Sequence, residues 1–148
     1  MRPWLWLAPL LLGGCVDLDK CGIARNWTPC AGETSEPGAN GSPPQITAFN
    51  MATCAYVDAP VLAGTMTVVD ADGDQQVAHV TTSQGAMRLS EADTELDPSL
   101  IADKTTWMGP ISLTVPGTSA ASFDIRVKVD DFNGNQSVPV CNTVSLVQ

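Results

Sequence analysis

The chain has 148 residues, of which seven are Lys or Arg and sixteen are Asp or Glu, so its formal net charge is −9 at pH 7. This length is enough for one domain with a hydrophobic core but hardly for two. The negative charge makes nucleic acid and anionic membrane surfaces poor partners, and divalent cations or basic protein patches better ones. The abundance of Val, Thr, Gly, Pro, Ser and Asp predicts many short strands joined by turns.

Residues 1–14 have the order of features that defines a secretory signal peptide. Arg2 precedes an apolar run over residues 4–12, and two small residues, Gly13 and Gly14, follow it. The run is shorter than the roughly 20 residues that a transmembrane helix needs. The sequence therefore predicts that residues 1–14 are removed on export.

Leu12, Gly13, Gly14 and Cys15 together resemble the lipobox of bacterial lipoproteins. This resemblance implies cleavage before Cys15, a diacylglycerol on its sulfur and a fatty acyl chain such as palmitate on its amine. It also implies that the protein is anchored in the bacterial cell envelope and touches the membrane only through this lipid. Val16 does not provide a retention signal of the aspartate type, which favours the outer membrane, on its periplasmic or surface face. The alternative is a plain secretory signal with Cys15 in a disulfide.

Residues 15–44 lack strand alternation and are rich in Gly and Pro, which predicts a flexible spacer after the acylated N-terminus. Acylation of Cys15 leaves four cysteines, Cys21, Cys30, Cys54 and Cys141, an even number that suits disulfides in an oxidising compartment. Cys21 and Cys30 are separated by eight residues, which favours a local bridge between them. Metal binding is the alternative, but the chain has no CxxC pair and only one histidine.

From residue 45 onward the pattern is that of short strands. The segment 123–130 is the clearest, because apolar Phe123, Ile125, Val127 and Val129 alternate with charged residues. Further strands are expected at 46–51, 61–70, 76–82, 86–89, 107–115 and 138–147, and the polar segment 90–104 is expected to be a crossover loop. Turn signals every ten or so residues predict an all-β, antiparallel β-sandwich of about seven strands over residues 45–148.

The segments 68–74 and 123–130 resemble the second and penultimate strands of bacterial Ig-like, PKD and cadherin-like modules, within the immunoglobulin-like superfamily. The Trp-x-Phe-Gly-Asp-Gly signature of PKD domains and the Asp-x-Asn-Asp-Asn linker of cadherins do not occur. In such sandwiches the first and last strands can be neighbours, so the resemblance implies a bridge between Cys54 and Cys141. In the expected last strand, Cys141 is out of phase with the apolar residues Val140 and Val144 and so lies on the opposite face. A bridge from Cys141 therefore requires either a bulge in this strand or a position outside the core. Pairings that cross the spacer, such as Cys21 with Cys54, stay open.

Two groups of polar residues follow predicted strands and are expected at the same end of the sandwich. They are Asp70, Asp72 and Asp74 in the first group, and Asp130, Asp131, Asn133 and Asn135 in the second. Such residues are good turn formers, and this is the favoured interpretation. The alternative is a Ca²⁺ site made by Asp70, Asp72, Asp74, Asp130, Asn133 and Asn135, because Ca²⁺ takes six to eight oxygen ligands. No other cofactor is expected.

A catalytic set is not apparent. His79 is the only histidine and lies in an expected strand, so a Ser-His-Asp arrangement would depend on one residue. Glu91, Asp93, Glu95 and Asp97 are close together, but a charged loop is usually only solvated. Trp107 and Phe123 are expected in the core, and Trp27 and Phe132 have no evident core to join, which makes them candidates for a binding contact.

The favoured function is that of a non-enzymatic envelope lipoprotein whose Ig-like domain binds a protein or glycan partner or serves as an assembly component. A Ca²⁺-dependent structural or adhesive module is the first alternative. A small carboxylate-dependent hydrolase is the second.

Overall fold

The structure is a computed structural model that describes residues 21, 23–100 and 103–148. The predicted signal peptide and the predicted lipidation site, Cys15, lie outside the described residues. Within the described part of the chain, no helix has the length and apolarity needed to cross a lipid bilayer.

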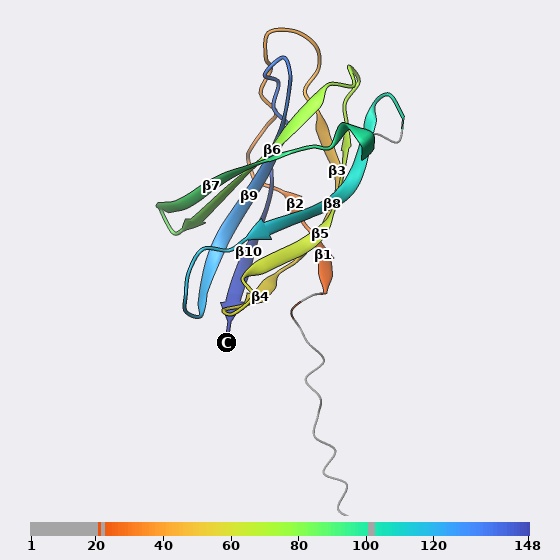
Figure 1. Cartoon of the computed structure of the whole chain (residues 1–148). Coiled ribbons are helices and arrows are strands. Elements are labelled where there is room, and N and C mark those ends of the chain that lie inside the picture. Colours follow the sequence, from red (N-terminus) through yellow and green to blue (C-terminus); the bar gives the residue numbers. More distant parts are fainter. Residues whose placement is uncertain (1–20, 22, 101–102) are drawn as a thin grey trace, which may run out of the picture.

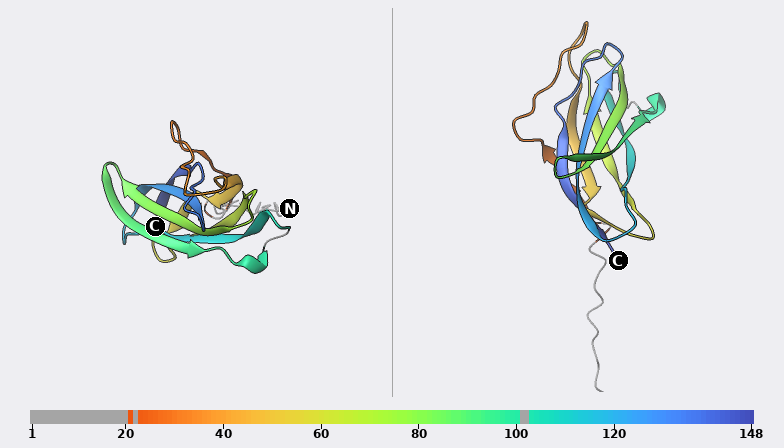
Figure 2. Two further views of the ribbon diagram at one scale, coloured as in Figure 1. Left: turned by 90° about the horizontal axis from the view of Figure 1, so that it is seen from above. Right: turned by 90° about the vertical axis from the view of Figure 1, so that its left-hand side faces the viewer.

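Two β-sheets pack face to face (Figures 1 and 2). The four-stranded sheet has the order β1 (Ala24–Asn26), β3 (Gln45–Ala52), β5 (Val61–Val69) and β8 (Thr106–Thr114). The six-stranded sheet has the order β2 (Thr28–Pro29), β10 (Val140–Val147), β9 (Ala121–Asp131), β6 (Gln75–Gln84) and β7 (Met87–Glu95), with β4 (Cys54–Tyr56) also paired to β10. All pairs are antiparallel except β4 with β10.

The predicted all-β, antiparallel sandwich is therefore confirmed, with ten strands in place of about seven. β3, β5 and β8 in one sheet and β6, β9 and β10 in the other follow the strand order of an immunoglobulin-like sandwich. The alternation predicted for 123–130 is present in β9, where Phe123, Ile125, Val127 and Val129 are buried in the core between the sheets.

β7 is longer than the sequence indicates. Residues 90–95, predicted as part of a loop, continue this strand and pair with β6 as far as Glu95. Eight of the nine residues of β7 are exposed, because the strand is the free edge of its sheet. A strand with so little buried surface has no apolar alternation, and its pattern therefore looks like that of a loop.

The predicted flexible spacer is wrong for its described part. β1 pairs with β3 and β2 pairs with β10, so the N-terminal segment adds a strand to each sheet. Trp27, predicted to have no core, is only 3% exposed and packs against Phe49 with ring centroids 5.0 Å apart. Two strands of three and two residues are too short to show alternation, and one large aromatic side chain supplies most of the packing.

Both predicted disulfide pairings are wrong. The bridges are Cys21–Cys54 and Cys30–Cys141, the first of which is the open alternative that crosses the predicted spacer. Pairing of β2 with β10 places Thr28 opposite Cys141, which brings Cys30 to the same region. Cys141 faces away from the core, so this bridge lies outside it, as its phase indicates.

The two ends of the sandwich differ. Cys54 lies beside the end of β10, at the end of the molecule marked by the C-terminus in Figure 1, and we call this end the base. The turns that follow β5 and β9, residues 70–74 and 131–139, lie at the opposite end. Residues 30–44, which we call the strap, run from Cys30 to this end and cover the two turns. We call the two turns together the loop tip.

Candidate functional site

The loop tip gathers three carboxylates that lie far apart in the sequence. Asp70 follows β5, Asp74 precedes β6, and Asp131 is the last residue of β9. One oxygen from each carboxylate lies within 4.8 Å of one from each of the others. Asp70 and Asp131 are 0% and 3% exposed, so two of these three acids have almost no contact with solvent.

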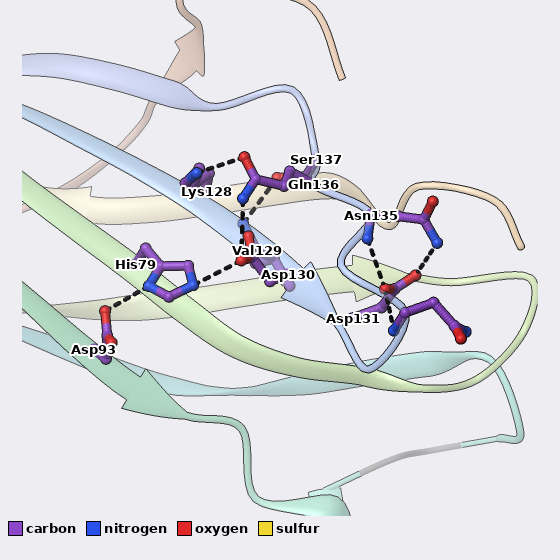
Figure 3. Close-up of polar contacts among 10 residues, drawn as sticks. His79, Asp93, Lys128, Val129, Asp130, Asp131, Asn135, Gln136 and Ser137 are labelled. Carbon is purple, nitrogen blue, oxygen red and sulfur yellow. Dashed lines mark hydrogen bonds and ion pairs between the residues drawn. The ribbon is translucent and has the colours of Figure 1, made fainter. Parts of the chain in front are cut away.

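Both carboxylate oxygens of Asp131 accept hydrogen bonds (Figure 3). Its Oδ1 accepts hydrogen bonds from the backbone N–H groups of Asn133 and Asn135, each at 2.8 Å, and its Oδ2 accepts one from Asn135 Nδ2 at 2.6 Å. These bonds fix the turn after β9 and point the carboxylate at its neighbours. Asp131 was noted in the sequence but was not included in the predicted set of ligands.

Asp70 and Asp74 each have one oxygen without a donor. Asp70 Oδ1 accepts a hydrogen bond from the N–H of Asp72 at 3.0 Å, and Asp74 Oδ2 accepts one from Asn133 Nδ2 at 2.7 Å. Asp70 Oδ2 and Asp74 Oδ1 are both buried and have no hydrogen-bond partner. Burial raises the pKa of Asp70 above its ordinary value, and the negative charges of Asp74 and Asp131 add to this effect.

The remaining predicted ligands have other roles. Asp72 is exposed, and its Oδ2 accepts a hydrogen bond from the N–H of Ser42 in the strap at 2.7 Å. Asp130 precedes Asp131 in a strand, so its side chain points to the opposite face of the sheet, towards His79. Asn133 Nδ2 donates a hydrogen bond to Asp74, and Asn135 Nδ2 donates one to Asp131. The structure thus assembles Asp70, Asp74 and Asp131, and it separates Asp72 and Asp130 from them.

The strap closes over the loop tip at Asn135, which is 1% exposed. Asn135 Oδ1 accepts a hydrogen bond from the N–H of Gly38 at 2.5 Å, and its Nδ2 also donates to the carbonyl of Asn40 at 2.6 Å. A Cβ at position 38 would collide with the backbone of residues 133–135, so this close approach requires glycine. Hydrogen bonds from one buried amide therefore connect the strap to the turn that carries Asp131.

The second feature is the outer surface of β7, β6, β9 and β10, which we call the polar face. His79 of β6 lies at its centre, between Asp93 of β7 and Asp130 of β9 (Figure 3). The His79 Nδ1 to Asp93 Oδ1 distance is 2.5 Å, and the His79 Nε2 to Asp130 Oδ2 distance is 2.8 Å. Gln136 extends this network, because its side chain binds both Asp130 and Lys128.

Two hollows lie side by side on the polar face, and Thr81 lines both of them. The first, of about 390 Å³, is bordered by His79, Glu91, Asp93 and Lys128. The second, of about 500 Å³, is bordered by Asp124, Arg126, Asn142 and Thr143. Glu33 of the strap forms an ion pair with Arg126, which lowers the pKa of the Glu33 carboxyl. Positively and negatively charged side chains therefore border the two hollows.

His79 is held between two carboxylates, because each of its ring nitrogens is hydrogen-bonded to an aspartate. Glu91, Asp93 and Glu95 lie along an exposed edge strand. Asp97 is also exposed, and its pKa is lowered by hydrogen bonds from the hydroxyl and N–H of Ser99. Phe132 lies at the loop tip and is 70% exposed, as a residue available for contact would be.

Comparison of the chain with protein-family models, with curated proteins and with solved structures gives no match.

Proposed function

We propose that this protein is a non-enzymatic envelope lipoprotein that binds a protein or glycan partner on its polar face. The observation that carries the proposal is the pair of hollows that meet at Thr81, each bordered by polar and charged side chains. The lipid anchor at Cys15 is proposed from the lipobox-like sequence.

The anchor and the fold together favour a module that stands close to the membrane. Cys21 is tied to Cys54 at the base of the sandwich. The six residue steps from Cys15 to Cys21 can span at most about 20 Å. A lipid on Cys15 would therefore hold the base near the bilayer and direct the loop tip away from it, with the polar face along the side.

Photo-crosslinking of the full chain in a bacterial host that processes lipoproteins tests the binding surface. Thr81, which lines both hollows, is replaced by benzoylphenylalanine, and Thr114, an exposed residue of β8 on the other sheet, serves as the matched control. We expect an adduct of higher mass at Thr81 and none at Thr114. Digestion of the adduct with a protease or with glycan hydrolases separates a protein partner from a glycan. Equal labelling at both positions, or at neither, would refute a specific role for the polar face.

Labelling with radioactive palmitate tests the anchor in the same host. The wild-type chain should incorporate the label and sediment with membranes, whereas Cys15→Ala should do neither. Label retained in Cys15→Ala would show that the lipid is attached elsewhere or that the lipobox interpretation is wrong.

A further inference from the structure

We propose that the loop tip binds one Ca²⁺ ion through the carboxylates of Asp70, Asp74 and Asp131. This proposal does not depend on the lipid anchor or on a partner for the polar face. It differs from the expectation drawn from the sequence in its ligands, because Asp131 takes the place of Asp130, and Asp72 lies outside the site.

The cluster places three acidic groups close together. The three carboxylates together carry up to three negative charges, and each has an oxygen within 4.8 Å of the others. No ion pair found among the described residues involves any of the three. Since like charges at this separation repel strongly in a buried site, the cluster needs either a cation or a bound proton.

Two unpartnered oxygens identify where a ligand is missing. Asp70 is 0% exposed, yet its Oδ2 has no hydrogen-bond donor, and the buried Oδ1 of Asp74 has none either. A buried carboxylate oxygen without a partner loses the hydration it had in the unfolded chain and gains nothing in return. A metal ion between the carboxylates would satisfy both oxygens at once.

The donor set fits calcium. Ca²⁺ binds oxygens at 2.3–2.6 Å, so its ligand oxygens lie within about 5 Å of one another, and one oxygen from each of the three carboxylates meets this condition. The candidate ligands are all hard oxygens, which suit Ca²⁺ better than softer metals. The donors that hold Asp131 and Asp74 come from the turn itself, so the site is organised before the ion binds.

A shared proton is the competing explanation for the same geometry. Burial raises the pKa of Asp70, and a protonated Asp70 could donate a hydrogen bond to Asp74 Oδ1. The two explanations differ in their response to Ca²⁺, because a proton-bridged pair without a metal site gains no stability from the ion.

A thermal melt of the full chain carrying Cys15→Ala, oxidised and free of lipid, separates them. A site with Kd near 10 µM should raise Tm by about 10 °C when 1 mM Ca²⁺ replaces EDTA. Asp74→Asn should abolish this rise, because it removes one charged ligand at constant side-chain size. Asp72→Asn removes an equal charge two residues away, outside the cluster, and should retain the rise.

Three results would overturn the proposal. The first is a wild-type Tm that does not respond to Ca²⁺, which would assign the geometry to a shared proton. The second is an equal loss of response in Asp72→Asn and Asp74→Asn, which would indicate non-specific attraction to an acidic protein. The third is an equal rise with 1 mM Mg²⁺, since that ion demands a tighter octahedral shell. Asp70→Asn provides a further check, because it should raise Tm in EDTA while removing the Ca²⁺ response.

Discussion

Replacing Cys30 and Cys141 together by serine removes the bridge that closes the longest covalent loop in the described chain. The two cysteines are 111 residues apart, and loop-closure entropy assigns about 5 kcal/mol to a bridge of this span. The same relation gives about 4 kcal/mol for Cys21–Cys54, whose separation is 33. Domains of this size are stable by only about 5–15 kcal/mol, so loss of either bridge should be severe.

The assay is guanidinium chloride unfolding of the full chain carrying Cys15→Ala, followed by the fluorescence of the buried tryptophans. For Cys30→Ser with Cys141→Ser, a loss of about 5 kcal/mol corresponds to a fall in midpoint of roughly 1–2 M. The matched double variant Cys21→Ser with Cys54→Ser should show a slightly smaller fall. A negligible fall in midpoint for the Cys30→Ser, Cys141→Ser variant would refute this disulfide connectivity. Recovery of a Cys21–Cys30 peptide in non-reducing peptide maps would refute it too. Either result would also refute the packing of the N-terminal segment.

Three further predictions concern the N-terminal segment and the loop tip. Trp27→Ala should lower the free energy of unfolding by about 3–5 kcal/mol, because Trp27 packs against Phe49 in the core. Phe132→Ala should change this free energy little, because Phe132 is 70% exposed. Guanidinium unfolding of both variants measures the two effects. Gly38→Ala should lower the free energy of unfolding by about 1–3 kcal/mol, because the added Cβ would meet the backbone of residues 133–135. Guanidinium unfolding measures this loss, and an unchanged midpoint would show that the strap does not lie against that turn. The pKa of the Asp70 carboxyl is raised in the folded state, so in EDTA the folded chain holds the proton of this carboxyl more tightly than the unfolded chain does. The contribution of Asp70 to stability therefore falls as the pH rises from about 4 through the folded pKa. The stability of Asp70→Asn relative to wild type should therefore increase between pH 4 and 7 in thermal melts, and a constant difference would contradict the burial of this carboxyl.

The strap links the two candidate surfaces. It contributes Glu33, which pairs with Arg126 on the polar face, and Asn40, whose carbonyl accepts a hydrogen bond from Asn135 at the loop tip. It begins at Cys30, which is bonded to Cys141 in β10. These contacts connect the strap to both the polar face and the loop tip.

The local sequence determined the fold class and most strand positions. Phe123, Ile125, Val127 and Val129 alternate with charged residues because one face of β9 is buried and the other meets water, and a period of two is visible in any such strand. Asp72-Gly73 and Asn133-Gly134 mark turns because glycine there adopts a positive φ, at 72° and 80° respectively. These signals depend only on neighbouring residues, which explains why the sequence alone carries them.

Only the tertiary structure decided the disulfide connectivity, the place of the N-terminal segment and the membership of the carboxylate cluster. Cys30 meets Cys141 because β2 pairs with β10, across more than one hundred residues of chain. Asp131 joins Asp70 and Asp74, while its neighbour Asp130 faces His79, because adjacent residues of a strand point to opposite faces of a sheet. The positions of the strands in the sequence predict that the two acidic segments lie at one end of the sandwich. Which of their side chains meet there depends on the register of the paired strands, and only the folded structure shows that register.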